Sequence, residues 1–216
     1  MPDAAAVHAL ATDVLAVACP VLTVGRGVPQ AVRLARRGGE GVSILTWQLW
    51  LLVGEPWIAY GVVAHVPAEV VTNAAASVVS LVTLVLAGRR ARTTGRVLAT
   101  AGGGTAAIAL LVAGSVATHD LAPISLVAVA GSLGVYIPQA VGTFRAPSVA
   151  GVSVPTWALT LVNSLAWGAY GLLISKAPVW IPSVVAVPTT AVIVLRLYTR
   201  RAGSPDRIVA SASSAT

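Results

Sequence analysis

Two charged side chains lie inside otherwise apolar stretches of the sequence, where they could do chemistry that their neighbours cannot. Glu55 lies in the stretch 42–64 and is followed by Pro56, and Arg26 lies inside the stretch 9–34. Ionisable residues within a membrane are costly and are functional candidates by default. Glu55 is therefore a possible proton site, or it makes a structural pair. We expect Arg26 to extend toward the nearer membrane surface.

Aromatic and amide side chains form a second set of candidates. Trp57 and Trp167 each lie several residues inside an apolar stretch, and Asn73 is a polar residue in another. A sugar presents C–H faces that pack on an aromatic ring and hydroxyls that an amide can both donate to and accept from. The alternatives are interface-belt positions for the two tryptophans and helix–helix hydrogen bonding for Asn73.

The composition determines where these residues must be placed. Of 216 residues, 56% are hydrophobic and only 10% are charged. A soluble domain carries about 25% charged residues to cover its surface. Most of the chain must therefore face lipid or other apolar helices, and we expect an all-α integral membrane protein.

Seven apolar segments are each long enough to span a bilayer, which takes about 20 residues. They are far longer than the roughly 10 residues of a membrane β-strand, so a barrel is disfavoured. The expected spans are 9–34, 42–64, 70–87, 97–117, 121–144, 152–174 and 180–198.

Arginines gather in the loops after spans one, three, five and seven, for example Arg36, Arg89, Arg145 and Arg200. Cytoplasmic loops carry such an excess of positive charge. We therefore expect the N-terminus outside and the C-terminus in the cytoplasm. The net charge of +7 indicates membrane topology and not nucleic-acid binding, because no polar domain is available to present a basic patch.

The sequence repeats itself at an interval of about 110 residues. The run 27–32 (GVPQAV) recurs as 136–141 (YIPQAV), Gly-Val-Ser recurs after each, and the run 57–61 (WIAYG) recurs as 167–171 (WGAYG). Two tryptophans, a Tyr-Gly and a Pro-Gln do not recur in the same order by chance. Because three spans per unit and one connecting span give both units the same orientation, the repeats are parallel.

This repetition predicts the organisation of the chain as two three-helix units joined by a linker helix. The expected parts are an N-terminal tail, a first repeat, a cytoplasmic loop with the linker helix, a second repeat and a disordered tail. Their ranges are 1–8, 9–87, 88–117, 118–199 and 200–216.

Two three-helix units, each with Pro-Gln near the end of its first helix and Gly-Val-Ser and Trp-x-x-Tyr-Gly after it, resemble the PQ-loop superfamily. Within it, the SWEET and SemiSWEET (MtN3/saliva) sugar-transporter branch is the most similar. The resemblance covers almost the whole chain except the fourth span and the two tails. It implies facilitative transport of a small neutral sugar by alternating access, without a cofactor.

The resemblance also implies which residues contact the solute. A tryptophan in the second helix and an asparagine in the third correspond to Trp57 and Asn73, and in the second repeat to Trp167 and Ser183. The residue one turn before the tryptophan lines the pocket in relatives, and in the second repeat it is Asn163. We therefore expect Trp57, Asn73, Trp167, Asn163 and Ser183 to bind substrate.

Prolines are expected to let helices bend during transport. Relatives carry four of them in the first two helices of each repeat, and Pro29, Pro138 and Pro155 match three of these positions, whereas the fourth is Leu45. A proline removes a backbone hydrogen bond and loosens its helix locally, so the three are hinge candidates. The alternative is a static kink.

Other functions are disfavoured or remain as rivals. The sequence contains no HExxH, no GxSxG and no buried carboxylate pair, so we expect neither an enzyme nor a metal site. The near rival is a proton-coupled amino-acid exporter of the PQ-loop type, with Glu55 as the titrating group, and another is a non-transporting membrane receptor or scaffold.

The expected partners are a mono- or disaccharide and membrane lipid, with no nucleic acid, and the chain is a monomer or a homo-oligomer. We expect a multi-pass protein of a bacterial plasma membrane, from an arginine-, alanine- and valine-rich composition.

Overall fold

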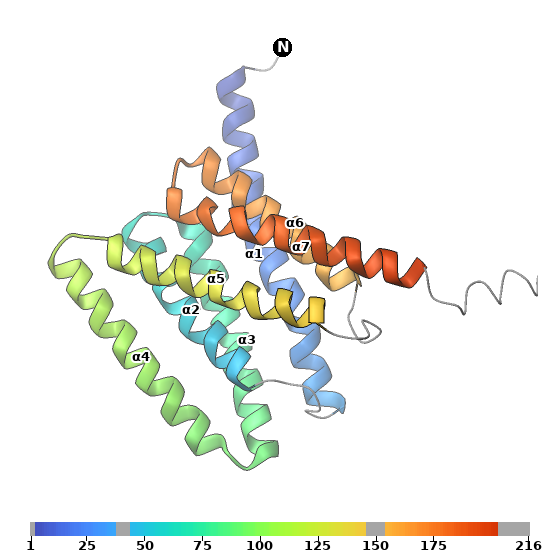
Figure 1. Ribbon diagram of the computed structural model, residues 1–216. Coiled ribbons are helices and arrows are strands. Elements are labelled where there is room, and N and C mark those ends of the chain that lie inside the picture. Colours follow the sequence, from blue (N-terminus) through green and yellow to red (C-terminus); the bar gives the residue numbers. More distant parts are fainter. Residues whose placement is uncertain (1–2, 38–43, 146–153, 203–216) are drawn as a thin grey trace, which may run out of the picture.

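The computed structural model describes residues 3–37, 44–145 and 154–202. These residues form seven α-helices and no strand, which confirms the expected all-α fold (Figure 1). The helices are α1 (Ala4–Arg37), α2 (Ile44–Val63), α3 (Pro67–Ala91), α4 (Thr94–Ala117), α5 (Ala122–Arg145), α6 (Val154–Leu173) and α7 (Ala177–Ala202).

The first helix begins earlier than expected, so residues 4–8 are helical and do not belong to a tail. Residues 4–6 are all alanine, which is the residue type with the highest helix propensity. Asp3 stabilises this start, because its carboxylate accepts a hydrogen bond from the Ala5 amide at 3.2 Å. The last helix ends at Ala202, and the expected disordered tail beyond it lies outside the described residues.

Each three-helix unit has the same internal order. In the first unit, α3 packs against both α1 and α2, and in the second, α7 packs against both α5 and α6. The units meet through exchanged pairs, α1 with α6 and α2 with α5, and α4 lies against α2, α3 and α5. The 3+1+3 arrangement predicted from the repeats is therefore confirmed.

The outer surface is apolar, as a lipid-facing surface must be. Leu10, Leu110, Leu126 and Leu195 are each more than 60% exposed. Four helices are long and apolar enough to cross a membrane within the described residues, namely Ala4–Arg26, Pro67–Arg89, Thr94–Ala117 and Ala177–Thr199. Exposed apolar area on this scale is not compatible with a soluble monomer, so the chain is a membrane protein.

The two units repeat their turns as well as their helices. His65 and Ser175 follow α2 and α6 at matching positions, and both have a φ of 55°. The amide after each of them donates to the carbonyl of the repeated glycine, Val66 to Gly61 at 2.8 Å and Lys176 to Gly171 at 3.0 Å. This tight turn brings the start of the next helix directly against the glycine, which explains why Tyr-Gly recurs.

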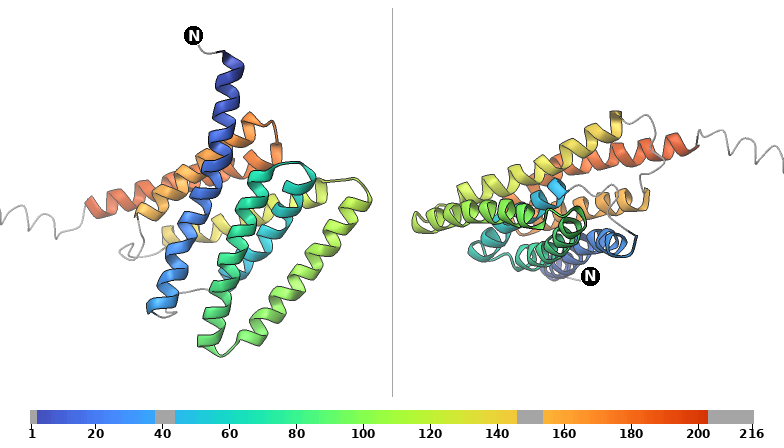
Figure 2. Two further views of the ribbon diagram at one scale, coloured as in Figure 1. Left: turned by 180° about the vertical axis from the view of Figure 1, so that it is seen from behind. Right: turned by 90° about the horizontal axis from the view of Figure 1, so that it is seen from below.

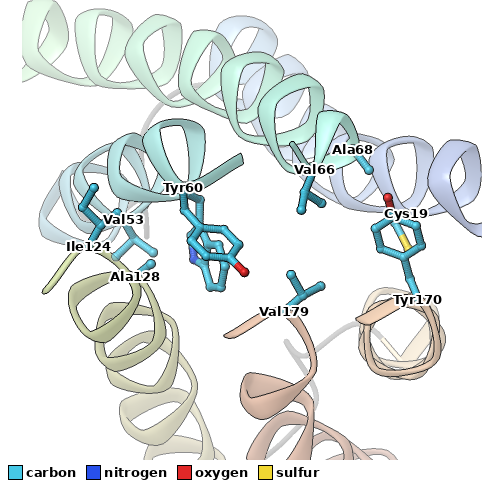
Figure 3. Packing of buried hydrophobic residues seen from close by; sticks show 10 residues of the cluster. Cys19, Val53, Tyr60, Val66, Ala68, Ile124, Ala128, Tyr170 and Val179 are labelled. Carbon is cyan, nitrogen blue, oxygen red and sulfur yellow. The ribbon is translucent and has the colours of Figure 1, made fainter. Parts of the chain in front are cut away.

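The two units converge at one end and diverge at the other. We call the end where α2, α4 and α6 finish the closed end, and the end where α1, α3, α5 and α7 finish the basic end. The described hydrophobic core gathers toward the closed end and includes Cys19, Tyr60, Val66, Tyr170 and Val179 (Figure 3). At the basic end, the ends of α1 and α3 point away from the ends of α5 and α7 (Figures 1 and 2).

We predict that the tight turn of the second unit does not tolerate a methyl group. A Cβ at Gly171 would lie 2.6 Å from the Trp180 amide nitrogen, so Gly171→Ala forces α7 away from α6. The expected loss is about 1–3 kcal/mol of stability, measured as a lower melting temperature in detergent. Gly103→Ala is the matched control, because a Cβ there meets nothing within 4 Å. Equal shifts in both variants would contradict the packing described.

Candidate functional site

A cavity of about 90 Å³ lies between the two units, with α1, α2, α3, α5, α6 and α7 contributing to its wall. At about 30 Å³ per water molecule in the liquid, this volume corresponds to about three water molecules. All five residues expected to bind substrate line it, namely Trp57, Asn73, Asn163, Trp167 and Ser183. Four helices, α2, α3, α6 and α7, therefore bring together five residues that the sequence spreads over the range 57–183.

Each tryptophan is hydrogen-bonded to the opposite unit. The Trp57 indole N–H, on α2, donates to the Ser132 hydroxyl on α5 at 3.0 Å. The Trp167 indole N–H, on α6, donates to the Thr23 hydroxyl on α1 at 3.0 Å. Ser132 and Thr23 occupy equivalent positions in the first helices of the two repeats, so the two bonds are related by the repeat symmetry.

In each unit, the tyrosine of the repeated motif packs edge to face against the tryptophan of the same motif. Trp57 and Tyr60 meet edge to face with centroids 5.8 Å apart and planes at 90°. Trp167 and Tyr170 meet at 5.9 Å and 76°. Because both tyrosines are buried in the core at the closed end, each indole is fixed by a ring on its own helix and a hydroxyl on the other unit.

The second repeat extends its hydrogen bond into a chain. The Thr23 hydroxyl, which accepts from Trp167, donates to the Asn163 carboxamide oxygen at 2.8 Å. The equivalent Ser132 hydroxyl donates to the Ala128 carbonyl at 2.9 Å, because the residue facing it in the first repeat is Val53. The difference between Asn163 and Val53, its equivalent in the first repeat, thus changes the hydrogen-bond network and not the indole–hydroxyl distances.

Asn73 is held by a residue that the sequence analysis did not select. Its amide nitrogen donates to the Glu69 carboxylate at 2.8 Å and to the Glu69 carbonyl at 2.9 Å. Glu69 is only 5% exposed and lines the same cavity. From the sequence, Glu69 is expected in a loop, because the third expected span begins at residue 70. The i, i+4 spacing from Glu69 to Asn73, which places both residues on one face of a helix, is the feature of the sequence that could have identified Glu69.

Arg26 also lines the cavity, toward the basic end. Its guanidinium carbon lies 4.9 Å from the centroid of the Trp50 ring. A cation over an indole face is stabilised by about 0.5–2 kcal/mol. Arg26 therefore packs against α2 inside the protein, whereas we had expected it to extend to the membrane surface.

Glu55 lies outside this cavity. It lines a groove of about 770 Å³ between α2 and α4, and the Thr105 hydroxyl of the linker helix donates to its carboxylate at 2.6 Å. The groove is otherwise made of small and aliphatic residues such as Ile58, Ala109 and Val112. This placement joins α4 to the first unit, and the proton-site role of Glu55 stays a prediction.

The three candidate hinge prolines fall within helices. Pro29 lies in α1 and Pro138 in α5, whose side chains at these positions are outside the described residues. Pro155 is the second residue of α6, where a missing amide proton is tolerated without a kink. Interior prolines are present at Pro56 in α2 and at Pro182 and Pro188 in α7. The hinge role of Pro29, Pro138 and Pro155 stays a prediction.

Comparisons with known proteins agree with this architecture. Residues 124–180 match the family model of the PQ loop repeat. The fold matches "The 3.7 Å resolution structure of a eukaryotic SWEET transporter" with a TM-score of 0.79 and 16% identity, over 92% of this chain and 100% of that chain. No curated protein matches the sequence.

These findings agree with the expected resemblance in two respects. Residues 124–180, in the second unit, match the PQ loop repeat, and the fold of the chain is similar to that of the SWEET transporter structure.

We predict that the two indole–hydroxyl bonds stabilise the closed end. Thr23→Val removes the acceptor for Trp167 and the donor for Asn163, while Ser132→Ala removes only the acceptor for Trp57. Each orphaned buried group costs about 1–3 kcal/mol, so both variants melt earlier and Thr23→Val melts first. Ser125→Ala is the control, since the Ser125 hydroxyl bonds only the Leu121 carbonyl of its own helix. A control loss as large as that of Thr23→Val would refute the assignment.

Proposed function

We propose that this protein transports a small sugar across the membrane by facilitative alternating access, as a uniporter. One observation carries the proposal: the indoles and amides of both units converge on a single cavity between those units. A ligand site at the interface of two repeats is the arrangement by which transporters expose a solute to each side in turn. The SWEET fold of the chain supports the same function.

The chemistry of the cavity suits a monosaccharide. Trp57 and Trp167 supply apolar ring surface for the C–H faces of the sugar, and Asn73, Asn163 and Ser183 supply hydrogen-bonding groups for its hydroxyls. The volume of about 90 Å³ is far below the roughly 300–1,000 Å³ of pockets for drug-sized ligands. Even a single sugar ring therefore needs the units to open further, and a disaccharide needs more opening, so we expect a single ring to be preferred.

The conformation corresponds to one state of such a cycle. With the C-terminus in the cytoplasm, as the arginine distribution favours, the divergent basic end faces inward and the packed closed end faces outward. The cavity then communicates with the cytoplasm. Closing the basic end and separating the closed end would present the same residues to the outside, with the three candidate hinge prolines allowing helices to bend. We expect this to occur in the plasma membrane.

Two charged side chains on the cavity support a second candidate function. Glu69 and Arg26 line it together with the aromatic residues, and an amino acid carries both complementary charges. A carrier of amino acids is therefore the alternative, with proton coupling at Glu55 as its expected mechanism. The two functions differ in their solute and in their dependence on a pH gradient.

Uptake of radiolabelled glucose and sucrose into proteoliposomes tests the proposal. We expect glucose to equilibrate without a pH gradient and faster than sucrose. Trp57→Ala and Asn73→Ala lower the initial rate by about tenfold or more, because each removes a cavity contact worth at least 1.4 kcal/mol. Trp47→Ala, on the same helix but away from the cavity, serves as the matched control.

Size-exclusion profiles and melting temperatures show that each variant is folded. Absence of sugar flux in the folded wild type, together with amino-acid flux that follows a pH gradient, would replace the proposal with the alternative.

A further inference from the structure

Glu69 is a buried carboxylate at the closed end of the cavity. It lies in the first turn of α3, is 5% exposed and faces the space between the units. Its equivalent in the second repeat, 110 residues on, is Val179, which lines the same cavity and is 3% exposed. The repeat symmetry is therefore broken at this position by one acidic side chain.

No cation of the described chain faces this carboxylate. Its hydrogen-bonding partner is the Asn73 amide, and the titratable groups near it are Cys19 on α1, Tyr60 on α2 and Tyr170 on α6. Arg26 lines the cavity two helical turns beyond Cys19, about 10 Å along the axis of α1, where it stacks on Trp50. A buried carboxylate without a cationic partner is strongly unfavourable, so either a proton or a cation from outside the chain must neutralise it.

The polar groups beside Glu69 are acceptors. Both hydrogens of the Asn73 amide are engaged, one by the Glu69 carboxylate and one by the Glu69 carbonyl. An asparagine has only these two donors, so Asn73 turns its carboxamide oxygen to the cavity. The Glu69 carboxylate has a second oxygen, which accepts no hydrogen bond from the described residues. This end of the cavity therefore offers two unmatched acceptors and one negative charge, with the indoles of Trp57 and Trp167 beside them.

We propose that this end of the cavity is a subsite for a primary ammonium group. An ammonium carries one positive charge and three donors, which match the Glu69 carboxylate and the Asn73 oxygen and leave one donor for water. Indole faces attract the same cation. A proton alone would neutralise Glu69 but would leave the Asn73 oxygen with water as its donor.

The inference rests on the proposed function and makes its substrate class more specific. The solute is a small amino sugar, held with its ammonium at Glu69 and its hydroxyls toward Asn163 and Arg26. The Asn163 oxygen is already occupied by Thr23, so its amide nitrogen is the group that remains for a hydroxyl. The Arg26 guanidinium has only donors, which suits hydroxyl oxygens at the wider end.

Counterflow into proteoliposomes tests the subsite with three related probes. These are radiolabelled glucosamine, N-acetylglucosamine and glucose, at about pH 7, where much of an amine of this kind carries its proton. The wild type is expected to show a KM for glucosamine about tenfold or more below that for either neutral sugar, as for one charge-assisted hydrogen bond.

Two variants separate the charge from the shape of the site. Glu69→Gln keeps an oxygen that accepts from Asn73 but has no charge, so the KM for glucosamine rises about tenfold and that for glucose changes less than about twofold. Glu69→Asp keeps the charge and restores part of the preference. Asp13→Asn, on an exposed part of α1 outside the cavity, is the matched control and leaves all three KM values unchanged.

The outcomes are distinguishable from those of the proposed function. Equal KM values for glucosamine and glucose, or a preference unaffected by Glu69→Gln, would overturn the subsite and leave sugar transport standing. Glucose flux that moves protons into the vesicles, and loses this coupling in Glu69→Gln, would overturn the ammonium in favour of a proton.

If no sugar is transported, tryptophan fluorescence of the purified protein tests the subsite alone, with methylammonium and glucosamine as probes. A saturable change that is lost in Glu69→Gln and kept in Asp13→Asn supports it even though the sugar function has failed. No change with either amine overturns it.

Discussion

The reciprocal pair of indole–hydroxyl hydrogen bonds is the contact on which the rest of the site depends. Trp57 reaches Ser132 and Trp167 reaches Thr23 across the boundary between the units, each at 3.0 Å. An indole N–H in an apolar interior has to find an acceptor, and these two find theirs only in the other unit. The pair therefore determines both how the units align and where the ring faces lie.

Repeated and unrepeated residues have different roles in the cavity. The repeated features, which are the helix order, the two tight turns and the two Trp–Tyr pairs, build a cavity from equivalent halves. The unrepeated residues make the two equivalent walls of that cavity chemically different. Glu69 and Asn73 make one wall acidic and rich in acceptors, while Val179 and Ser183 stand at the equivalent positions. A solute with distinct ends would bind in one orientation.

The sequence was sufficient for the fold because membrane helices depend on local signals. Apolar length located all seven helices to within six residues at either end, and the Trp-x-x-Tyr-Gly repeat located the two units. The five expected substrate-binding residues do share a cavity, since the repeat constrains which positions become equivalent.

The sequence did not reveal features that depend on how helices meet. Glu69 is expected in a loop from the sequence, but α3 begins at Pro67 and includes it. Arg26 is expected to extend to the membrane surface, but its guanidinium packs on the Trp50 ring. The acceptors Thr23 and Ser132 are ordinary hydroxyls in apolar segments, so nothing local distinguishes them. The divergence of the units at the basic end is a property of packing between helices far apart in the sequence.

The most direct test of this account measures distances between spin labels at the two ends of the bundle. One pair is Val62→Cys with Leu172→Cys at the closed end, the other Arg89→Cys with Thr199→Cys at the basic end, both in a Cys19→Ala background. All four positions are exposed in the described structure and equivalent between the repeats. The account predicts a narrow closed-end distribution that broadens when Trp57→Phe and Trp167→Phe remove both indole donors. A closed-end distribution that stays equally narrow in the double variant would contradict it.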